Sequence, residues 1–330
     1  MSELQHHQSK GTESKKRGFK DYIGLGARGM AMGACDVVPG VSGGTMAFIL
    51  GIYEELISSI RAVGRSEFLR AIVSFRLTDA ARAINLPFLL SVLSGILIAI
   101  LSLAKLMTWL LENQPVYLWS FFFGLVLASV LVVSKRIPKW NLLLVVALLV
   151  TAVAAYILVG LVPAQTPDDL GFVFLSGALA ICAMILPGIS GSFILLLLSK
   201  YQFIVGRVAK ISDGTFATED GVILGTFALG CGIGLITFAQ LLGWLFKRYH
   251  DLTVALLTGL MLGSLRKVWP WKETIETYTD RHGEIQPLVQ DNILPGFGTE
   301  VWIALALAVV GFIVVIAIEK MGNSELGDHV

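Results

Sequence analysis

The sequence is poor in charged residues, and this shortage defines the class of protein. Only 15% of the 330 residues are charged and 55% are hydrophobic, and the mean hydropathy is +0.76. A water-soluble domain of this size cannot bury so much apolar surface, so we expect an integral membrane protein. The net charge of +1 provides no basic field for nucleic acid, and we expect no such partner.

Cysteine and histidine are also scarce. Cys35, Cys182 and Cys231 lie in apolar segments without CxxC spacing and are predicted to be small core residues. The histidines fall in predicted tails and loops and form no metal-binding pattern, so no metal or resident cofactor is expected. They are His6, His7, His250, His282 and His329.

The first twenty residues lack the apolar core and cleavage site of a signal peptide. They are polar and end in four basic residues. We interpret residues 1–20 as a cytoplasmic tail. The four are Lys15, Lys16, Arg17 and Lys20.

Long apolar runs fill the rest of the chain. A spanning helix needs about 20 apolar residues, and six stretches reach or approach that length: residues 86–111, 117–133, 140–162, 222–246, 252–265 and 301–318. Two more apolar regions, residues 22–60 and 171–205, are each interrupted by a Pro-Gly motif. We interpret them as re-entrant hairpins that enter and leave on one side of the membrane.

Loop charges support this topology. With a cytoplasmic N-terminus and hairpins that do not cross, the inside segments hold sixteen Lys and Arg residues and the outside segments hold six. That bias follows the positive-inside rule and places both termini in the cytoplasm. The six outside residues are Arg207, Lys210, Arg266, Lys267, Lys272 and Arg281.

The chain also repeats itself. Gly29 matches Gly177 at a spacing of 148, and GLVLAS at residues 124–129 matches GLMLGS at residues 259–264 at a spacing of 135. Each half holds one hairpin and three crossings, an odd number, so the halves have opposite orientations. We expect an all-α polytopic protein built as an inverted repeat. Residues 21–165 and 166–320 form the repeats, and residues 321–330 form a cytoplasmic tail.

The two Pro-Gly breaks are PGVSGGT at residues 39–45 and PGISGSF at residues 187–193. Ser42 and Ser190 occupy N-cap positions for outgoing half-helices over residues 46–60 and 193–205. Free amides at two helix starts that converge near the midplane would bind one anionic group. Such breaks often mark only packing or kink points, but a matched pair within a repeat favours a binding site.

Five ionisable residues at membrane depth are candidates for function. Arg28 either contacts an anionic ligand or extends to the interface, and Lys200 poses the same choice. Lys105 matches Gln240 in the other half, a pair that suggests a polar cavity, although Lys105 also lies near the outer end. Asp36 is a candidate for proton exchange, for sodium binding or for pairing with Arg28.

Glu54 is the fifth of these residues, and its position is nearer the cytoplasmic interface. It is a candidate coupling group, with solvation or pairing with the arginines after Ile60 as the simpler interpretation. Neither it nor Asp36 has an acidic mate in the second half.

The run RGMAMGACDVVPGVSGGT at residues 28–45, followed by GIYEE at residues 51–55 and LPGISGS at residues 186–192, resembles the bacterial polyprenyl-phosphate transporter family called PopT. The resemblance extends over about residues 18–320. It implies a translocase that returns undecaprenyl phosphate from the outer to the inner leaflet for cell-wall and surface-glycan synthesis. Membrane lipids are then its surroundings and a lipid phosphate its ligand.

Matching positions extend the headgroup role to particular residues. Asp36 and Glu54 are implied only as candidate coupling groups for a proton or sodium ion. Phe193 stands where the first motif has Thr45, so we expect the first break to contribute most of the headgroup recognition. The implied phosphate-binding residues are Arg28, Ser42, Gly43, Gly44, Thr45, Ser190, Gly191 and Ser192.

Two other function classes compete with the lipid transporter. A carrier or channel for a small soluble anion would use two helix starts equally well. An intramembrane lipid phosphatase would need a nucleophile with a general acid or base, yet no histidine lies in a predicted membrane segment. We therefore expect a transporter and not an enzyme. The oligomeric state is left open.

Overall fold

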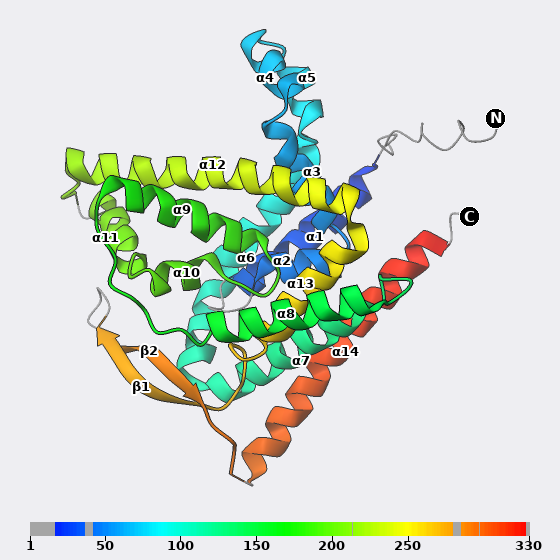
Figure 1. Ribbon diagram of the computed structural model, residues 1–330, viewed down its shortest axis with the longest axis vertical. Helices are drawn as coiled ribbons and strands as arrows, with labels where there is room; N and C mark the ends of the chain where they lie inside the picture. The colour runs from blue at the N-terminus through cyan, green and yellow to red at the C-terminus, as the bar shows by residue number, and fades with distance from the viewer. Residues whose placement is uncertain (1–16, 37–41, 213, 280–284, 297, 328–330) are drawn as a thin grey trace.

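The computed structural model describes residues 17–36, 42–212, 214–279, 285–296 and 298–327. Helices dominate this part of the chain (Figure 1). The first half contains α1 (Phe19–Asp36), α2 (Gly43–Ile49), α3 (Tyr53–Val63), α4 (Ser66–Val73), α5 (Leu77–Ala83), α6 (Leu86–Asn113), α7 (Pro115–Ser134) and α8 (Leu142–Leu158). The second contains α9 (Leu170–Ile185), α10 (Gly191–Leu197), α11 (Tyr201–Ser212), α12 (Thr218–Arg248), α13 (His250–Ser264), β1 (Lys272–Thr279), β2 (Ile285–Asn292) and α14 (Thr299–Gly327).

Local sequence explains several helix starts. Pro115 stands at the first position of α7, where its missing amide donor leaves no bond unmade. Asn141 and Asp169 cap α8 and α9, because their side chains accept from the amides of Leu144 and Phe172 at 2.9 Å each.

Four helices are long and apolar enough to cross a membrane: α6, α7, α12 and α14. Helix α7 is the central one, since 61% of its apolar window is buried, against 17–22% in the other three. Those three direct most of their apolar side chains outward, as helices in contact with lipid do. The expected spans over residues 140–162 and 252–265 correspond to the shorter helices α8 and α13, of 17 and 15 residues.

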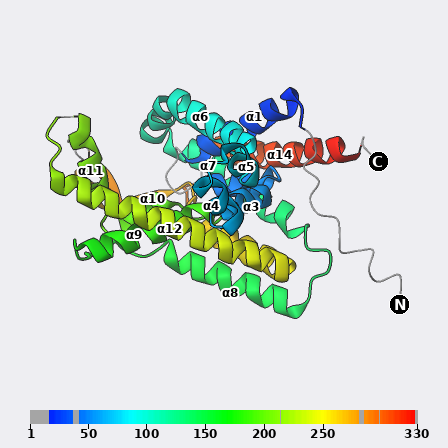
Figure 2. The ribbon, with the colours of Figure 1, turned by 90° about the horizontal axis from the view of Figure 1, so that it is seen from above.

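Helix packing in the first half recurs in the second. Helix α1 lies along α6 as α9 lies along α12, and both pairs are side by side in Figure 2. Helix α7 of the first half packs against α14 of the second half. Helix α13 of the second half packs against α8 of the first, so both of these contacts join the two halves.

Glycines mark the same contacts in both halves. A Cβ on Gly29 or on Gly177 would collide with the backbone of the facing helix, α6 or α12. Gly124 of α7 is equally close to α14, and Gly259 of α13 to α8. These contacts need glycine because it lets two helix backbones approach closely. The residue pairs that match at spacings of 148 and 135 therefore occupy corresponding contacts.

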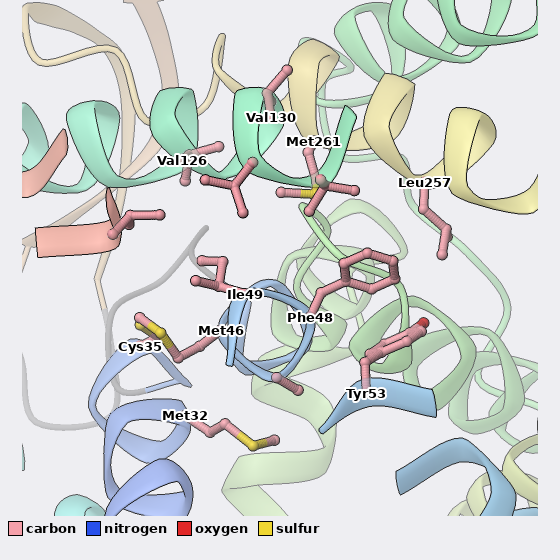
Figure 3. Close-up of a cluster of buried hydrophobic side chains, with 14 of the residues drawn as sticks. Met32, Cys35, Met46, Phe48, Ile49, Tyr53, Val126, Val130, Leu257 and Met261 are labelled. Atoms are coloured by element: carbon pink, nitrogen blue, oxygen red, sulfur yellow. The ribbon is translucent and has the colours of Figure 1, made fainter. Parts of the chain in front are cut away.

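The core of the protein surrounds α2, every residue of which is buried. Figure 3 shows Phe48 and Ile49 of α2 directed toward Val126 of α7 and Met261 of α13. Tyr53, at the start of α3, lies beside Phe48, with ring centroids 4.9 Å apart. The described part of the first break, residues 42–45, is thus held inside the molecule and not at its edge.

Two regions depart from the sequence expectation. The fold was expected to be all-α, but the segment after α13 contains β1 and β2, which pair as an antiparallel hairpin. Helices α4 and α5 project from the rest of the molecule at the top of Figure 1. Several apolar side chains of these helices and of the turn between them are exposed, including Leu69, Val73 and Phe75.

Candidate functional site

The described part of the first break begins at Ser42, because residues 37–41, with Pro39 and Gly40, lie outside the described residues. Ser42 caps α2 as predicted: its hydroxyl accepts from the amide of Gly44 at 3.1 Å. Asp36, the last residue of α1, accepts from the amide of Gly43 at 2.7 Å.

These bonds correct one expectation about the first break. The amides of Gly43 and Gly44 were expected to be free for an anion, but Asp36 and Ser42 already occupy them. Asp36 therefore has a structural role that was not expected from the sequence: its carboxylate accepts a hydrogen bond at the start of the next helix, α2. A carboxylate in that position is favoured by the helix dipole.

The second break turns sharply at Gly188, whose φ of +91° suits glycine. It packs against α13, since a Cβ there would lie 2.8 Å from the hydroxyl oxygen of Ser264. Ser190 precedes α10 but, within the described chain, its side chain makes no capping bond. It pairs instead with Ser192, the two hydroxyl oxygens lying 2.7 Å apart.

The two breaks meet in the structure. The backbone amide of Gly188 donates to the hydroxyl oxygen of Thr45 at 2.9 Å. The Ser42 hydroxyl donates to the carbonyl of Leu186 at 3.2 Å, and the Tyr53 hydroxyl donates to that of Ile185 at 3.0 Å. Side chains in and just after the first break thus bind the backbone at and just before the second, so the two breaks converge as expected.

Each outgoing segment bends a second time, so the expected continuous half-helices over residues 46–60 and 193–205 are wrong. The bends lie at Gly51 and Ser199, 148 residues apart, with φ of +71° and +53°. Helices α10 and α11 meet at an angle of 112°. Glycine tolerates this backbone conformation easily, whereas serine rarely adopts it, so the second bend was hidden in the sequence.

Lys200 follows the bend at Ser199 and is 1% exposed. Its ammonium lies 2.5 Å from the carboxylate of Asp168 and 3.0 Å from the carbonyl oxygen of Thr166. The side chain is therefore neither an interfacial cation nor open to a ligand in this conformation.

The other candidates are spread through the molecule. Arg28 is partly buried in α1 and takes part in an interaction; it precedes Asp36 by eight residues, about 12 Å along the helix. Glu54 is exposed, with one carboxylate oxygen 3.4 Å from Nε2 of His250. Lys105 is exposed on α6, whereas Gln240 bonds the guanidinium and carbonyl of Arg61, each at 2.9 Å.

One group of basic residues was counted only as loop charge in the sequence. Arg266, Lys267 and Lys272 share a pocket with Gly160 at the end of α8. The Lys267 ammonium lies 4.8 Å from the ring centroid of Phe193, in the first turn of α10. The pocket therefore adjoins the second break, a position that the sequence spacing gave no means to foresee.

Burial changes the acid–base behaviour of this group. Desolvation lowers the pKa of Lys267, and desolvation together with the neighbouring charge of Lys267 lowers the pKa of Lys272 well below the usual value for lysine. The environment of this pocket therefore disfavours the charged form of both side chains.

The remaining expectations concern metals and thiols. No group of three or more His, Cys, Asp or Glu residues suited to a metal ion occurs within the described ranges. Cys35 is buried, Cys182 and Cys231 are partly buried, and all three are free thiols.

The apolar helices, with two backbone breaks in contact among them, define a multi-pass membrane protein. Comparison with known families is consistent with this class: the family described as undecaprenyl phosphate translocase-like matches residues 32–286. The chain belongs to this family.

Two curated relatives agree. A polyprenyl-phosphate transporter from Vibrio cholerae serotype O1 (strain ATCC 39315 / El Tor Inaba N16961) is 46% identical over 275 residues, covering 83% of this chain and 86% of that protein. A protein of the same description from Staphylococcus aureus (strain NCTC 8325 / PS 47) is 27% identical over 257 residues, covering 74% and 84%. No solved structure matches the chain.

Proposed function

We propose that this protein transports polyprenyl phosphate, such as undecaprenyl phosphate, and binds its headgroup where the two breaks meet. The family and the names of both relatives support the substrate class. The observation that carries the location is the bond from the Gly188 amide to Thr45, which joins the breaks inside the apolar core. Polar backbone at such a place is typical of transporter binding sites.

Within this site we assign the phosphate contact first to the second break. The hydroxyls of Ser190 and Ser192 are bonded to each other, and that bond is readily exchanged for bonds to a phosphate oxygen. Gly191 lies between them and starts α10. Ser42, Gly43, Gly44 and Thr45 would form the other side of the site. The amides of Gly43 and Gly44 could bind an anion there only after they release Asp36 and Ser42. Arg28 remains a predicted headgroup contact.

We further propose that the protein is an inverted repeat over residues 21–165 and 166–320. Each half would contribute one re-entrant hairpin, α1 to α3 or α9 to α11, and three crossings. The repeated pairings of α1 with α6 and of α9 with α12 support this arrangement. So do the second bends at Gly51 and Ser199, which share the 148-residue spacing of the motifs.

Direction and location belong to the same proposal. The protein would return the lipid carrier from the outer to the inner leaflet of the bacterial cytoplasmic membrane, with both termini in the cytoplasm, for cell-wall and surface-glycan synthesis. The bias of basic residues supports the orientation. Asp36 is the better candidate for proton or sodium coupling because it contacts the first break, whereas Glu54 is exposed beside His250.

A carrier for a small soluble anion is the alternative function. The lipid transporter moves a polyprenyl phosphate between leaflets, whereas the anion carrier moves a soluble anion across the membrane. One vesicle preparation can therefore distinguish the two functions. The protein is reconstituted in vesicles that contain a fluorescent polyprenyl phosphate, and exchange between leaflets is followed by quenching of the outer leaflet. Uptake of inorganic phosphate is measured in parallel.

We expect leaflet exchange with wild-type protein and a strong loss with Ser190→Ala together with Ser42→Ala, or with Arg28→Ala, at equal amounts of folded protein. Lys247→Gln, which changes an exposed residue at the end of α12, serves as the control. Phosphate uptake without lipid exchange would favour the alternative. Wild-type exchange in every site variant would refute the location of the site.

A further inference from the structure

We propose that Arg266, Lys267 and Lys272 form a separate binding site for a phosphate monoester, next to the second break. The assignment deepens the proposed function, on which it rests in so far as the phosphate belongs to a lipid. The three residues line one pocket together with Gln290 and Asn292 of β2. They converge on it from the segment after α13 and from β1.

Neutral groups hold all three cations in place. The Arg266 guanidinium donates to the carbonyl of Tyr156 at 3.0 Å and lies 4.5 Å from that ring's centroid. The Lys272 ammonium donates to the carbonyl of Lys267 at 2.7 Å and lies 3.9 Å from the ring centroid of Trp119. Aromatic faces and carbonyl oxygens position a cation without neutralising it.

The described acids next to this pocket do not pair with its basic side chains. Within the described residues, no ion pair includes Arg266, Lys267 or Lys272. Glu273 and Asp291 are exposed and occupy opposite positions on the two strands of the hairpin. Three partly buried cations with neutral neighbours are electrostatically costly alone, and an anion relieves that cost.

The charge of the site selects the chemical class of its ligand. A phosphate monoester has a charge of about −1.5 to −2 at neutral pH and three acceptor oxygens, which matches three cations better than a carboxylate does. Two amide side chains, Gln290 and Asn292, lie on the same pocket. Asn292 already donates to the carbonyl of Arg266 at 2.8 Å and so fixes that segment.

The position of the pocket suggests what the site does. Lys267 lies against Phe193, in the helix turn that also contains Ser192. A phosphate held by Lys267 would therefore lie close to the hydroxyl pair of Ser190 and Ser192. The β hairpin forms part of the pocket wall. In the expected topology the hairpin and the segment after α13 lie outside the cell, on the side of the membrane with few basic residues. The pocket would therefore receive the headgroup before it reaches the breaks.

The test measures binding to the purified full-length protein in detergent, using inorganic phosphate and a polyprenyl phosphate as separate probes. Lys267→Gln and Lys272→Gln are compared with Lys247→Gln, and Arg266→Gln with Arg248→Gln, whose guanidinium lies near the Tyr249 ring outside the pocket. Losing one charged hydrogen bond should weaken binding about 10- to 100-fold. The two controls should bind as the wild type does.

A measurement on the wild-type protein covers the case in which a variant fails to fold. Acetylation of Lys267 and Lys272 is followed by mass spectrometry with and without each probe, with Lys247 as the internal reference. Slower acetylation of the two pocket lysines alone supports the site. Protection by the lipid only assigns it to a headgroup, and equal protection by inorganic phosphate assigns it to the free anion.

The outcome that overturns the proposal is separate from failure of the transport function. Unchanged affinity in the pocket variants, or equal acetylation with and without both probes, refutes the site even if leaflet exchange is normal. Absence of leaflet exchange in the wild type refutes the transport function, whereas binding at the pocket would then still be measured directly.

Discussion

The hydroxyl oxygen of Thr45 accepts a hydrogen bond of 2.9 Å from the backbone amide of Gly188. This bond joins two segments that are 143 residues apart in the chain, and both groups are buried. Valine has nearly the same shape as threonine but cannot accept the bond. Thr45→Val should therefore leave a buried amide unpaired, at a cost of about 1–3 kcal/mol in stability.

Thermal unfolding in detergent tests this expectation. Thr45→Ser is the control because it keeps the acceptor, and it should melt closer to the wild type than Thr45→Val does. Equal melting of wild type and Thr45→Val would show that the bond does not hold the breaks together.

Two substitutions at Asp36 distinguish a structural role of this residue from a role that depends on its charge. Asp36→Asn keeps an oxygen that can accept from Gly43, whereas Asp36→Ala removes the acceptor and should cost about 0.5–2 kcal/mol, as the loss of a helix cap does. If the charge takes part in coupling, Asp36→Asn should fold normally yet lose the dependence of transport on a proton or sodium gradient. An unchanged gradient dependence in Asp36→Asn would exclude that coupling role.

Glycine substitutions test the equivalence of the two halves. A Cβ on Gly124 or on Gly259 would collide with the backbone of the helix that packs against it, so alanine at either position should lower the melting temperature by a similar amount. Gly232 of α12 is the matched control, because nothing lies within 4 Å of its added Cβ. A large effect at one position and none at the other would mean that the halves are not packed alike.

Lys200 and Asp168 should respond unequally to substitution. Asp168→Ala leaves a buried ammonium without its carboxylate, with the Thr166 carbonyl and two aromatic rings as its neighbours. Lys200→Met leaves a carboxylate that is 65% exposed to solvent. We expect Asp168→Ala to be the more destabilising change, because an unpaired charge is costly only where it is buried. Ile52 occupies the matching place in the first half, so an apolar residue fits this bend. Melting temperatures of both variants decide the order.

The lowered pKa of Lys272 predicts how stability changes with pH. Between that pKa and the value of about 10.4 for an unfolded lysine, the unfolded chain binds more protons than the folded one, so the free energy of unfolding rises with pH. The facing charges are Arg266 and Lys267, and Gln290 and Asn292 are neutral. Lys272→Met should flatten this rise. Identical pH profiles would contradict the expectation.

Phosphate binding at the same pocket should change in the opposite direction. As pH rises through the lowered pKa, Lys272 loses its charge and the affinity for inorganic phosphate should fall. Lys272→Arg retains its charge at high pH and should bind with less pH dependence. Titrations of both proteins over the same pH range provide the measurement.

The sequence was sufficient to predict much of this architecture. The end of α1 before the first motif, the break at residues 187–193 and the capping role of Ser42 all follow from glycine, proline and serine at helix ends, which are local signals. The long spans α6, α7, α12 and α14 follow from apolar length alone.

Other features depended on contacts between distant segments. Nothing near Ser199 indicates a left-handed residue, and nothing near Lys200 indicates Asp168 as its partner. Asp36 was considered for coupling, but its bond to Gly43 depends on how the chain turns between them. The β hairpin could have been suspected from the β-branched and aromatic residues of KETIETYT at residues 272–279.

The pairing of α7 with α14 and of α8 with α13 has a consequence for biosynthesis. Helix α7 is enclosed on most sides, yet one of its neighbours, α14, comes much later in the chain. Until α14 leaves the ribosome, Gly124 of α7 has only lipid or a temporary partner against it. The first half therefore cannot complete its own packing, and a chain truncated before α14 should be recognised by membrane quality control as unassembled.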